Sequence, residues 1–277
     1  MTIPYPLLTL AGFLLGIYGT LSGISGGVLL VPLLLLLYPQ EEPHVVTNIS
    51  LAAVFFNVLS GTIAYGLRGR VDYKAGLIFS LATMPGSIAG AFAVEFIPRQ
   101  LFDLIFGVLV LLVAGLILRR SPNPPSHNPA FELSGSRSGY VTHSVIDSHG
   151  HQYIYSYSLP FSLLFSLGIG FLSTLLGSGG GALMVPALIY LFHFPLPIAT
   201  ATSQFMLTII TLTGTIVHII KGTFTRGYRR TFFLTIGVLL GAQVGAWLSE
   251  RVQGVGIIRL LAFALIIVGL RLLWSGW

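Results

Sequence analysis

Two glycine-rich segments of this 277-residue chain have the composition of an anion-binding backbone. Their central residues are Ser25, Gly26, Gly27, Gly179, Gly180 and Gly181. Each segment lies inside a long apolar block, so a helix interrupted there leaves backbone N–H groups and the positive end of a helix dipole available to an anion. Glycine also lets a ligand approach the backbone closely, because it has no Cβ. The alternative is that these glycines only permit a kink or close packing.

Polar side chains follow each glycine-rich segment, near the start of the next apolar block. Hydroxyl and amide groups at such positions cap helices or hydrogen-bond to the oxygens of an anion. Capping explains one or two residues in each half, but it explains less well the run from Thr202 to Gln204. The candidate substrate-binding side chains are therefore Asn48, Ser50, Thr202, Ser203 and Gln204.

Histidines offer two further kinds of chemistry. His218 stands where the first half has Tyr65, and it could carry a coupled proton. The alternative is a polar residue at the membrane boundary. Three histidines of the middle segment could bind a metal ion, although exposed strand and turn histidines are the simpler interpretation. They are His143, His149 and His151.

No enzyme motif competes well with these patterns. The sequence lacks both His-Glu-x-x-His and a phosphate-binding Gly-x-x-x-x-Gly-Lys loop, and we expect no catalytic residue, no cofactor and no bound metal. Residues 23–26, Gly-Ile-Ser-Gly, fit the Gly-x-Ser-Gly of intramembrane serine proteases of the rhomboid type. A single tetrapeptide in a glycine-rich helix is weak evidence, and the corresponding position of the second half is Gly179.

The composition places these residues in a membrane. The chain is 54% hydrophobic and only 8% charged, whereas soluble domains carry about 25% charged residues. This excludes a soluble enzyme, a nucleic-acid-binding protein and a disordered chain, and the partners that we expect are the lipid bilayer and a small ligand. The chain has no cysteine, so it has no disulfide framework. Nothing in the sequence indicates the oligomeric state.

The apolar blocks predict an all-α polytopic membrane protein with a small extramembrane β-hairpin. We expect a first repeat over residues 1–118, a polar linker over 119–158 and a second repeat over 159–277. Each repeat begins with a broken helix or a helix followed by a re-entrant half-helix, and three further spans follow. The strands of the hairpin are expected at residues 140–147 and 152–158. The blocks run over residues 5–38, 45–67, 75–94, 101–118, 159–192, 198–220, 231–249 and 255–273.

The two halves of the chain repeat the same motifs in the same order. Residues 16–27 parallel 170–181 at an offset of 154, and each segment is followed by Val-Pro. Gly-x-x-x-Gly-Ala occurs at residues 86–91 and again at 241–246. These glycine pairs are expected to serve helix packing. Duplicated membrane halves that contain broken helices are typical of transporters.

The loop charges predict the orientation if each broken block counts as one crossing. The loops around residues 68–74, 119–137 and 221–230 then share a side that holds most of the basic residues. The positive-inside rule favours four spans in each half, with the termini and the central loop in the cytoplasm of a cell-membrane protein. An odd number of crossings in each half would place the basic loops of the two halves on opposite faces.

The paired glycine-rich motifs, together with residues 199–204 (Ala-Thr-Ala-Thr-Ser-Gln) and 214–218 (Gly-Thr-Ile-Val-His), resemble the sulfite exporter TauE/SafE family of membrane permeases. The resemblance covers nearly the whole chain. It implies transport of a small sulfur-containing anion such as sulfite, thiosulfate, sulfoacetate or another organosulfonate. A passive anion channel remains the main alternative, and an intramembrane protease is a third.

Overall fold

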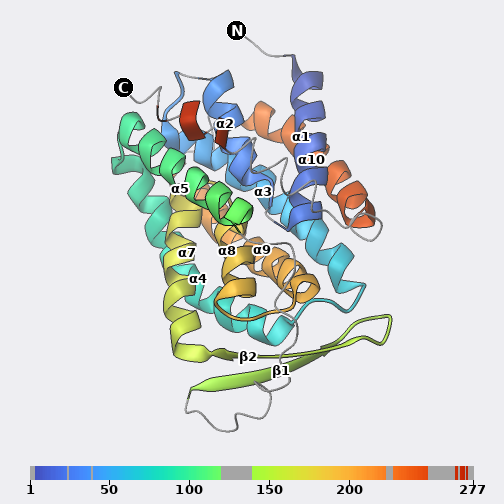
Figure 1. The fold of residues 1–277 in the computed structure, drawn as a ribbon. Coiled ribbons are helices and arrows are strands. Elements are labelled where there is room, and N and C mark those ends of the chain that lie inside the picture. Colours follow the sequence, from blue (N-terminus) through green and yellow to red (C-terminus); the bar gives the residue numbers. More distant parts are fainter. Residues whose placement is uncertain are drawn as a thin grey trace.

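The computed structural model describes residues 4–23, 25–38, 40–119, 139–222 and 227–248, together with residues 266, 267, 269–271 and 273. The described chain is mostly helical and carries one two-stranded hairpin at one end of the helix bundle (Figure 1). Residues 120–138 of the predicted linker at 119–158 and most of the predicted span at 255–273 lie outside the described residues.

The described helices match the predicted apolar blocks to within a few residues. Four of them are long and apolar enough to cross a membrane, namely α3, α4 with the short η1, α9 and α10. The chain is therefore a multi-pass membrane protein by the length and composition of its helices. The elements are α1 (Tyr5–Ser22), α2 (Gly27–Leu37), α3 (Pro43–Gly66), α4 (Tyr73–Ala93), η1 (Val94–Phe96), α5 (Arg99–Arg119), β1 (Tyr140–Ile146), β2 (Gln152–Ser158), α7 (Leu159–Leu175), α8 (Gly181–Tyr190), α9 (Leu196–Ile220) and α10 (Tyr228–Leu248).

The glycine-rich segments interrupt the helices because their backbone is left-handed. Helix α1 ends at Gly23, with φ of 73°, and α2 begins after Gly26, with φ of 65°. The second break repeats this geometry, and α8 begins after Gly180, with φ of 76°. Such a backbone costs little for glycine but is unfavourable for other residues. Ser25 adopts a φ of 70° at the first break, although it carries a side chain.

The first broken block is a re-entrant helical hairpin. Helices α1 and α10 begin at the same end of the bundle, where the rings of Tyr5 and Phe233 stack at a centroid distance of 4.6 Å. The segment after α2 lies at this end too, since Glu41 Oε1 accepts a hydrogen bond of 2.7 Å from Arg230 Nη1. The chain therefore leaves this end through α1 and returns to it through α2, as Figure 1 shows. We call this end of the bundle the N-terminal end.

The second broken block has the same shape but opens toward the opposite end. Phe161 and Phe165 at the start of α7 both contact the ring of Phe192, which follows α8. The β-hairpin lies at this end as well, and Arg70 Nε lies 4.0 Å from Asp147 Oδ2 in the hairpin turn. We call this opposite end of the bundle the hairpin end. The two re-entrant blocks thus enter the bundle from opposite ends.

This arrangement corrects the predicted orientation. Arg68 lies at the hairpin end, where its Nη1 donates to the carbonyl of Ala246 at 2.8 Å. Arg230 lies at the N-terminal end, so the basic loops of the two halves are on opposite faces of the bundle. The prediction was wrong because a re-entrant block adds no net crossing. For the same reason α1 begins at the end of the bundle opposite to the β-hairpin.

The glycine pairs serve helix packing, as predicted. A Cβ on Gly86 of α4 would lie 2.1 Å from the carbonyl oxygen of Leu167 in α7. A Cβ on Gly241 of α10 would lie 2.1 Å from the carbonyl oxygen of Phe13 in α1. These two contacts join corresponding positions of the two halves. Each half therefore packs its first helix against a helix of the other half, α1 on α10 and α7 on α4.

The hairpin forms as predicted, with a small shift of one strand end. Strands β1 and β2 pair antiparallel from Tyr140 opposite Ser158 to Ile146 opposite Gln152. The turn is held by Asp147, whose Oδ1 accepts from the backbone N–H groups of His149 and His151 at 2.9 Å each. Burial alone would raise the pKa of Asp147, but these hydrogen bonds outweigh it and lower that pKa.

Candidate functional site

The two glycine-rich breaks meet in the interior of the bundle. The hydroxyl of Ser25 donates to the carbonyl oxygen of Ser178 at 3.2 Å. A Cβ on Gly27 would lie 2.2 Å from that same carbonyl oxygen, so only glycine fits there. Val54 contacts both breaks, since its side chain lies 2.9 Å from a Cβ on Gly27 and 2.6 Å from one on Gly179. Val54 is near the middle of α3, so the breaks meet near the mid-height of the bundle.

Each break also contacts the polar helix start of the other half. A Cβ on Gly23 would lie 2.6 Å from Thr200 Cγ2, at the start of α9. A Cβ on Gly177 would lie 2.6 Å from the Cα of Thr47, at the start of α3. The structure therefore brings together the two kinds of segment that the sequence analysis singled out, and it joins them across the two halves.

Asn57 and Thr20 complete this region, and both are buried. The sequence analysis named neither of them as a site residue. The amide of Asn57 in α3 donates to the carbonyl of Ser25 at 3.1 Å, and its oxygen accepts from the hydroxyl of Thr20 at 3.0 Å. Asn57 is 1% exposed. An asparagine in the middle of an apolar span is a functional signal in itself, because polar side chains in a bilayer are costly.

Several buried polar side chains of α3, α7 and α9 have no hydrogen-bond partner within the described structure. Both amide atoms of Asn48 are unpaired, as are the hydroxyls of Ser50 and Ser173 and the Oε1 atom of Gln204. Asn48 is 1% exposed, and the other three residues are fully buried. A buried polar group without a partner costs about 1–3 kcal/mol, so these groups are suited to a ligand or to water.

The remaining candidates have partners already. Thr202 Oγ1 accepts from the backbone N–H of Asp72 at 3.0 Å. Ser203 donates to the carbonyl of Thr200 at 2.8 Å and lies 3.4 Å from the carbonyl of Gly23. The Nε2 amide of Gln204 lies 3.4 Å from the carbonyl of Gly19, which leaves only its oxygen unpaired. Thr202 thus belongs to the link with the hairpin rather than to the breaks.

His218 lies apart from the breaks, in the last turn of α9 at the N-terminal end. It is fully buried, and Lys221 one turn later pairs with Glu95 at 2.8 Å. The hairpin histidines do not meet in a metal-binding group, since no cluster of three possible ligands occurs among the residues described. His143 is not an exposed strand residue as expected, because its side chain is only 14% exposed.

The interior of the bundle is largely apolar, and its buried polar residues are uncharged wherever it is described, except near its two ends. The buried charged residues are Asp72, Asp103 and Asp147. Asp103 pairs with Arg99 at 2.9 Å at the start of α5, and the other two lie at the hairpin end. The region of the breaks therefore offers hydrogen-bond donors without a fixed charge.

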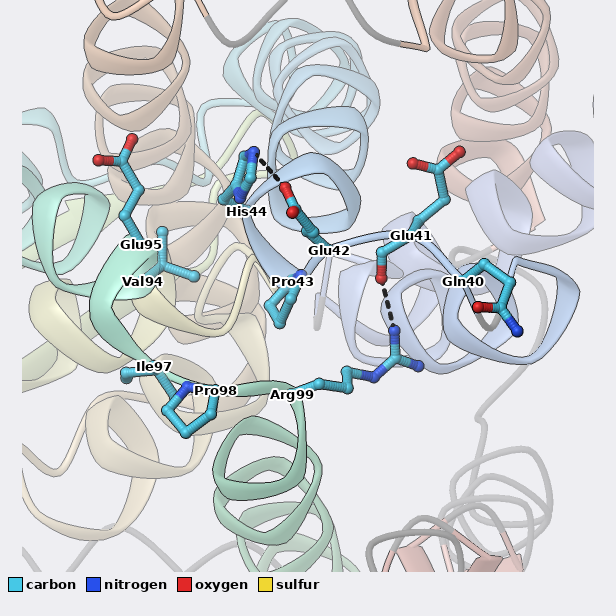
Figure 2. A pocket seen from close by; sticks show the side chains of 10 residues that line it. All are labelled: Gln40, Glu41, Glu42, Pro43, His44, Val94, Glu95, Ile97, Pro98 and Arg99. Atoms are coloured by element: carbon cyan, nitrogen blue, oxygen red, sulfur yellow. Dashed lines mark hydrogen bonds and ion pairs between the residues drawn. The ribbon is translucent and has the colours of Figure 1, made fainter.

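A pocket of about 560 Å³ opens at the N-terminal end (Figure 2). It is lined by the segment before α3 and by the connection from η1 to α5, and Figure 2 shows the 2.8 Å hydrogen bond from Arg99 Nη1 to the carbonyl of Glu41. Glu41, Glu42 and Glu95 also line it. Three carboxylates beside one guanidinium repel an anion at close range. The breaks are therefore the better candidate for an anion site.

The geometry at Ser25 does not support a protease. A serine nucleophile needs a base within hydrogen-bond reach. Ser25 instead donates to a backbone carbonyl and is fully buried.

Comparison with known proteins agrees with this geometry. The family model described as sulfite exporter TauE/SafE matches residues 8–272. The probable membrane transporter protein YunE of Bacillus subtilis (strain 168) is 32% identical over 279 residues, which cover 98% of each chain. A probable membrane transporter protein of Xylella fastidiosa is 26% identical over the whole of this chain and 98% of its own length. No solved structure gives a significant match. This chain is a membrane transporter and not an enzyme, and it belongs to the sulfite exporter TauE/SafE family.

Proposed function

We propose that this transporter carries small sulfur-containing anions, such as sulfite, thiosulfate, sulfoacetate or other organosulfonates, and that it binds them where the two glycine-rich breaks meet. The observation that carries the proposal is the contact of the breaks at Ser25 and Ser178 in an uncharged interior. Two helices begin there, α2 after Gly26 and α8 after Gly180. The first N–H groups of a helix have no partner within it, so both helix starts present donors to an anion.

The chemistry of the site suits an anion that must also leave it. Backbone donors and neutral side chains hold a sulfonate or sulfite oxygen without a permanent opposite charge. The unpaired Nδ2 amide of Asn48 and the unpaired hydroxyl of Ser50 can donate to an anion. Gln204 can donate only through its Nε2 amide, which in this conformation lies 3.4 Å from the carbonyl of Gly19. Asn48 and Ser50 belong to α3 and Gln204 belongs to α9, so both halves contribute to the site.

We further propose that residues 1–118 and 159–277 are inverted repeats joined by the linker at 119–158. Corresponding positions make corresponding contacts, with Gly86 on Leu167 and Gly241 on Phe13. The two re-entrant blocks enter from opposite ends, so each block lies between the shared site and one end of the bundle. In the described conformation the breaks touch, and an anion enters only when the Ser25 hydroxyl moves away from Ser178. In alternating access, one re-entrant block then moves away from the site at a time, so that the site opens to one end of the bundle and stays closed to the other.

Ligand affinity of purified protein tests the proposal. Sulfite, thiosulfate, sulfoacetate, taurine and sulfate are screened by thermal shift, since a ligand far above its Kd stabilises the fold by a few kcal/mol. Gln204→Leu removes a polar group of similar size and should weaken binding about ten- to a hundredfold. Gly180→Val should abolish binding, because a Cβ at this left-handed position would lie 2.5 Å from Ser173 Oγ and the start of α8 would have to shift.

A packing variant is the control. Gly86→Ala should lower stability and leave the affinity of the folded fraction unchanged. Unchanged affinity in monodisperse Gly180→Val and Gln204→Leu would remove the breaks from the site. Flux through liposomes then separates a carrier from a passive channel, since only a carrier accumulates the anion against its gradient when a coupling ion is supplied.

A further inference from the structure

A buried carboxylate of the helix bundle contacts both strands of the β-hairpin, whose turn is held separately by Arg68 and Arg70. Asp72 is the N-cap of α4, where its Oδ1 accepts from the backbone N–H of Ala75 at 2.9 Å. Its Oδ2 accepts from the hydroxyl of Tyr155 and lies 2.7 Å from Nδ1 of His143. Asp72 is 5% exposed. One carboxylate therefore joins α4 to both strands of the hairpin.

The same contact places the hairpin over the polar start of α9. The ring of Tyr155 lies 4.2 Å from that of Phe194, which precedes α9, and Tyr157 packs on Phe79 at 5.1 Å. The backbone N–H of Asp72 donates to Thr202 Oγ1 at 3.0 Å. Movement of the hairpin away from Asp72 would therefore break the contact of Tyr155 with Phe194 and free the segment that leads into α9.

Of the side chains that face Asp72, His143 is the one that can supply a compensating positive charge. These side chains are His143 from β1, Tyr155 and Tyr157 from β2, and the uncharged Thr202 from α9. Among the described residues no lysine or arginine forms an ion pair with Asp72, and the nearby Arg70 instead faces Asp147. Burial and the adjacent carboxylate raise the pKa of Tyr155 and raise that of Tyr157 to about 12, so both hydroxyls keep their protons.

His143 is placed to hold an additional proton. Its Nδ1 faces the carboxylate, and its Nε2 lies 3.4 Å from the hydroxyl of Tyr157. A tyrosine hydroxyl donates to a neutral ring nitrogen and accepts from a protonated one. Both ring nitrogens therefore have a partner in either charge state. Histidine is also the side chain that changes charge near neutral pH.

We propose that Asp72 and His143 form a proton-binding site that latches the hairpin over the start of α9, and that this proton is the coupling ion of the transporter. The site takes up one proton from solvent, and its net charge changes from −1 to 0. The coupling role rests on the proposed function, whereas the latch does not.

The charge balance gives the direction of the effect. With the proton bound, the carboxylate is paired and the latch is closed. When the proton leaves, the negative charge of Asp72 stays buried beside neutral hydrogen-bonding groups alone, which is unfavourable. The latch therefore opens as pH rises, and the segment that leads into α9 is freed at the hairpin end.

Hydrogen–deuterium exchange of the whole protein in lipid nanodiscs tests the latch. Rates corrected for intrinsic exchange are compared near pH 6 and near pH 8 over residues 140–158 and 192–204. In the wild type, opening should increase about tenfold between the two pH values, because one proton is released when the latch opens. Asp72→Asn keeps an N-cap, and His143→Gln keeps a hydrogen-bonding amide, but neither pair takes up the proton. Both variants should lose the pH dependence.

His149→Gln is the matched control, because His149 is an exposed histidine of the same hairpin whose ring lies beside Ser148 and His151 in the turn. Persistence of the pH dependence in Asp72→Asn and His143→Gln, or its equal loss in His149→Gln, would overturn the proposal. A second readout is sulfoacetate accumulation in proteoliposomes under a pH gradient, which Asp72→Asn should abolish. If the wild type moves no sulfoacetate, the proposed substrate fails while the exchange experiment still decides the latch. If Asp72→Asn accumulates sulfoacetate normally, the coupling role fails.

Discussion

Replacing Asn57 with alanine should loosen the first glycine-rich break. Asn57 holds that break through two hydrogen bonds, one of 3.1 Å to the carbonyl of Ser25 and one of 3.0 Å from the hydroxyl of Thr20. A hydrogen bond contributes about 0.5–1.5 kcal/mol, and membrane examples average about 0.6 kcal/mol. Asn57→Ala should therefore cost roughly 1–3 kcal/mol. Its binding affinity should fall as well, because Ser25 loses the contact that fixes its left-handed backbone.

The assay is reversible unfolding in mixed micelles, together with ligand affinity of the folded variants. Thr62→Val is the matched control, since Thr62 in the same helix makes one hydrogen bond of 3.0 Å to Thr208. It should cost about half as much and leave the affinity unchanged. A double-mutant cycle of Asn57→Ala with Thr20→Val should give a coupling energy of about 1 kcal/mol. Equal effects of Asn57→Ala and Thr62→Val on stability and affinity, with no coupling to Thr20, would refute this reasoning.

Three further outcomes are expected. Because the chain has no cysteine, single cysteines at the exposed Lys74 and Arg229 report topology directly, and a membrane-impermeant thiol reagent applied to intact cells should label one and spare the other. Labelling of both would contradict the inverted arrangement. Gly86→Ala should destabilise the protein by about 1–3 kcal/mol in thermal unfolding, because its Cβ meets the Leu167 carbonyl, whereas Gly115→Ala, with nothing within 4 Å, should be neutral or slightly stabilising. The lowered pKa of Asp147 stabilises the hairpin turn above the ordinary aspartate pKa of 3.8, and this contribution is lost as pH falls below that value. Amide exchange at His149 and His151 should therefore become faster than intrinsic rates predict in acid, and Asp147→Asn should remove that pH dependence.

Much of the fold could be predicted because each local signal is strong. The apolar blocks, the turn at residues 148–150 and the alternating strands beside it all have a short-range cause in hydropathy and turn chemistry. The packing role of Gly86 and Gly241 follows equally from small residues spaced by four.

The orientation could not be predicted, because it depends on where the chain goes after each break. Gly23 and Gly26 permit either a continued span or a reversal, and nothing in their residue types decides between them. Arg230 meets Glu41 only in the folded bundle. Two of the contacts that matter for the site, Asn57 with Ser25 and Asp72 with His143, join residues 32 and 71 positions apart. A single sequence gives no pairing information at such separations.

The exchange of first helices between the halves sets a condition on synthesis in the cell. Helix α1 packs on α10, which follows it by roughly 200 residues along the chain. At about 5–20 residues per second, α1 waits on the order of 10–45 s in the bilayer before its partner is made. A helix satisfies its own backbone hydrogen bonds, so α1 can persist in lipid alone. Its small-residue face nevertheless stays uncovered during that time. A ribosome stalled before α10 would thus leave an inserted but incomplete bundle, a natural substrate for membrane quality control.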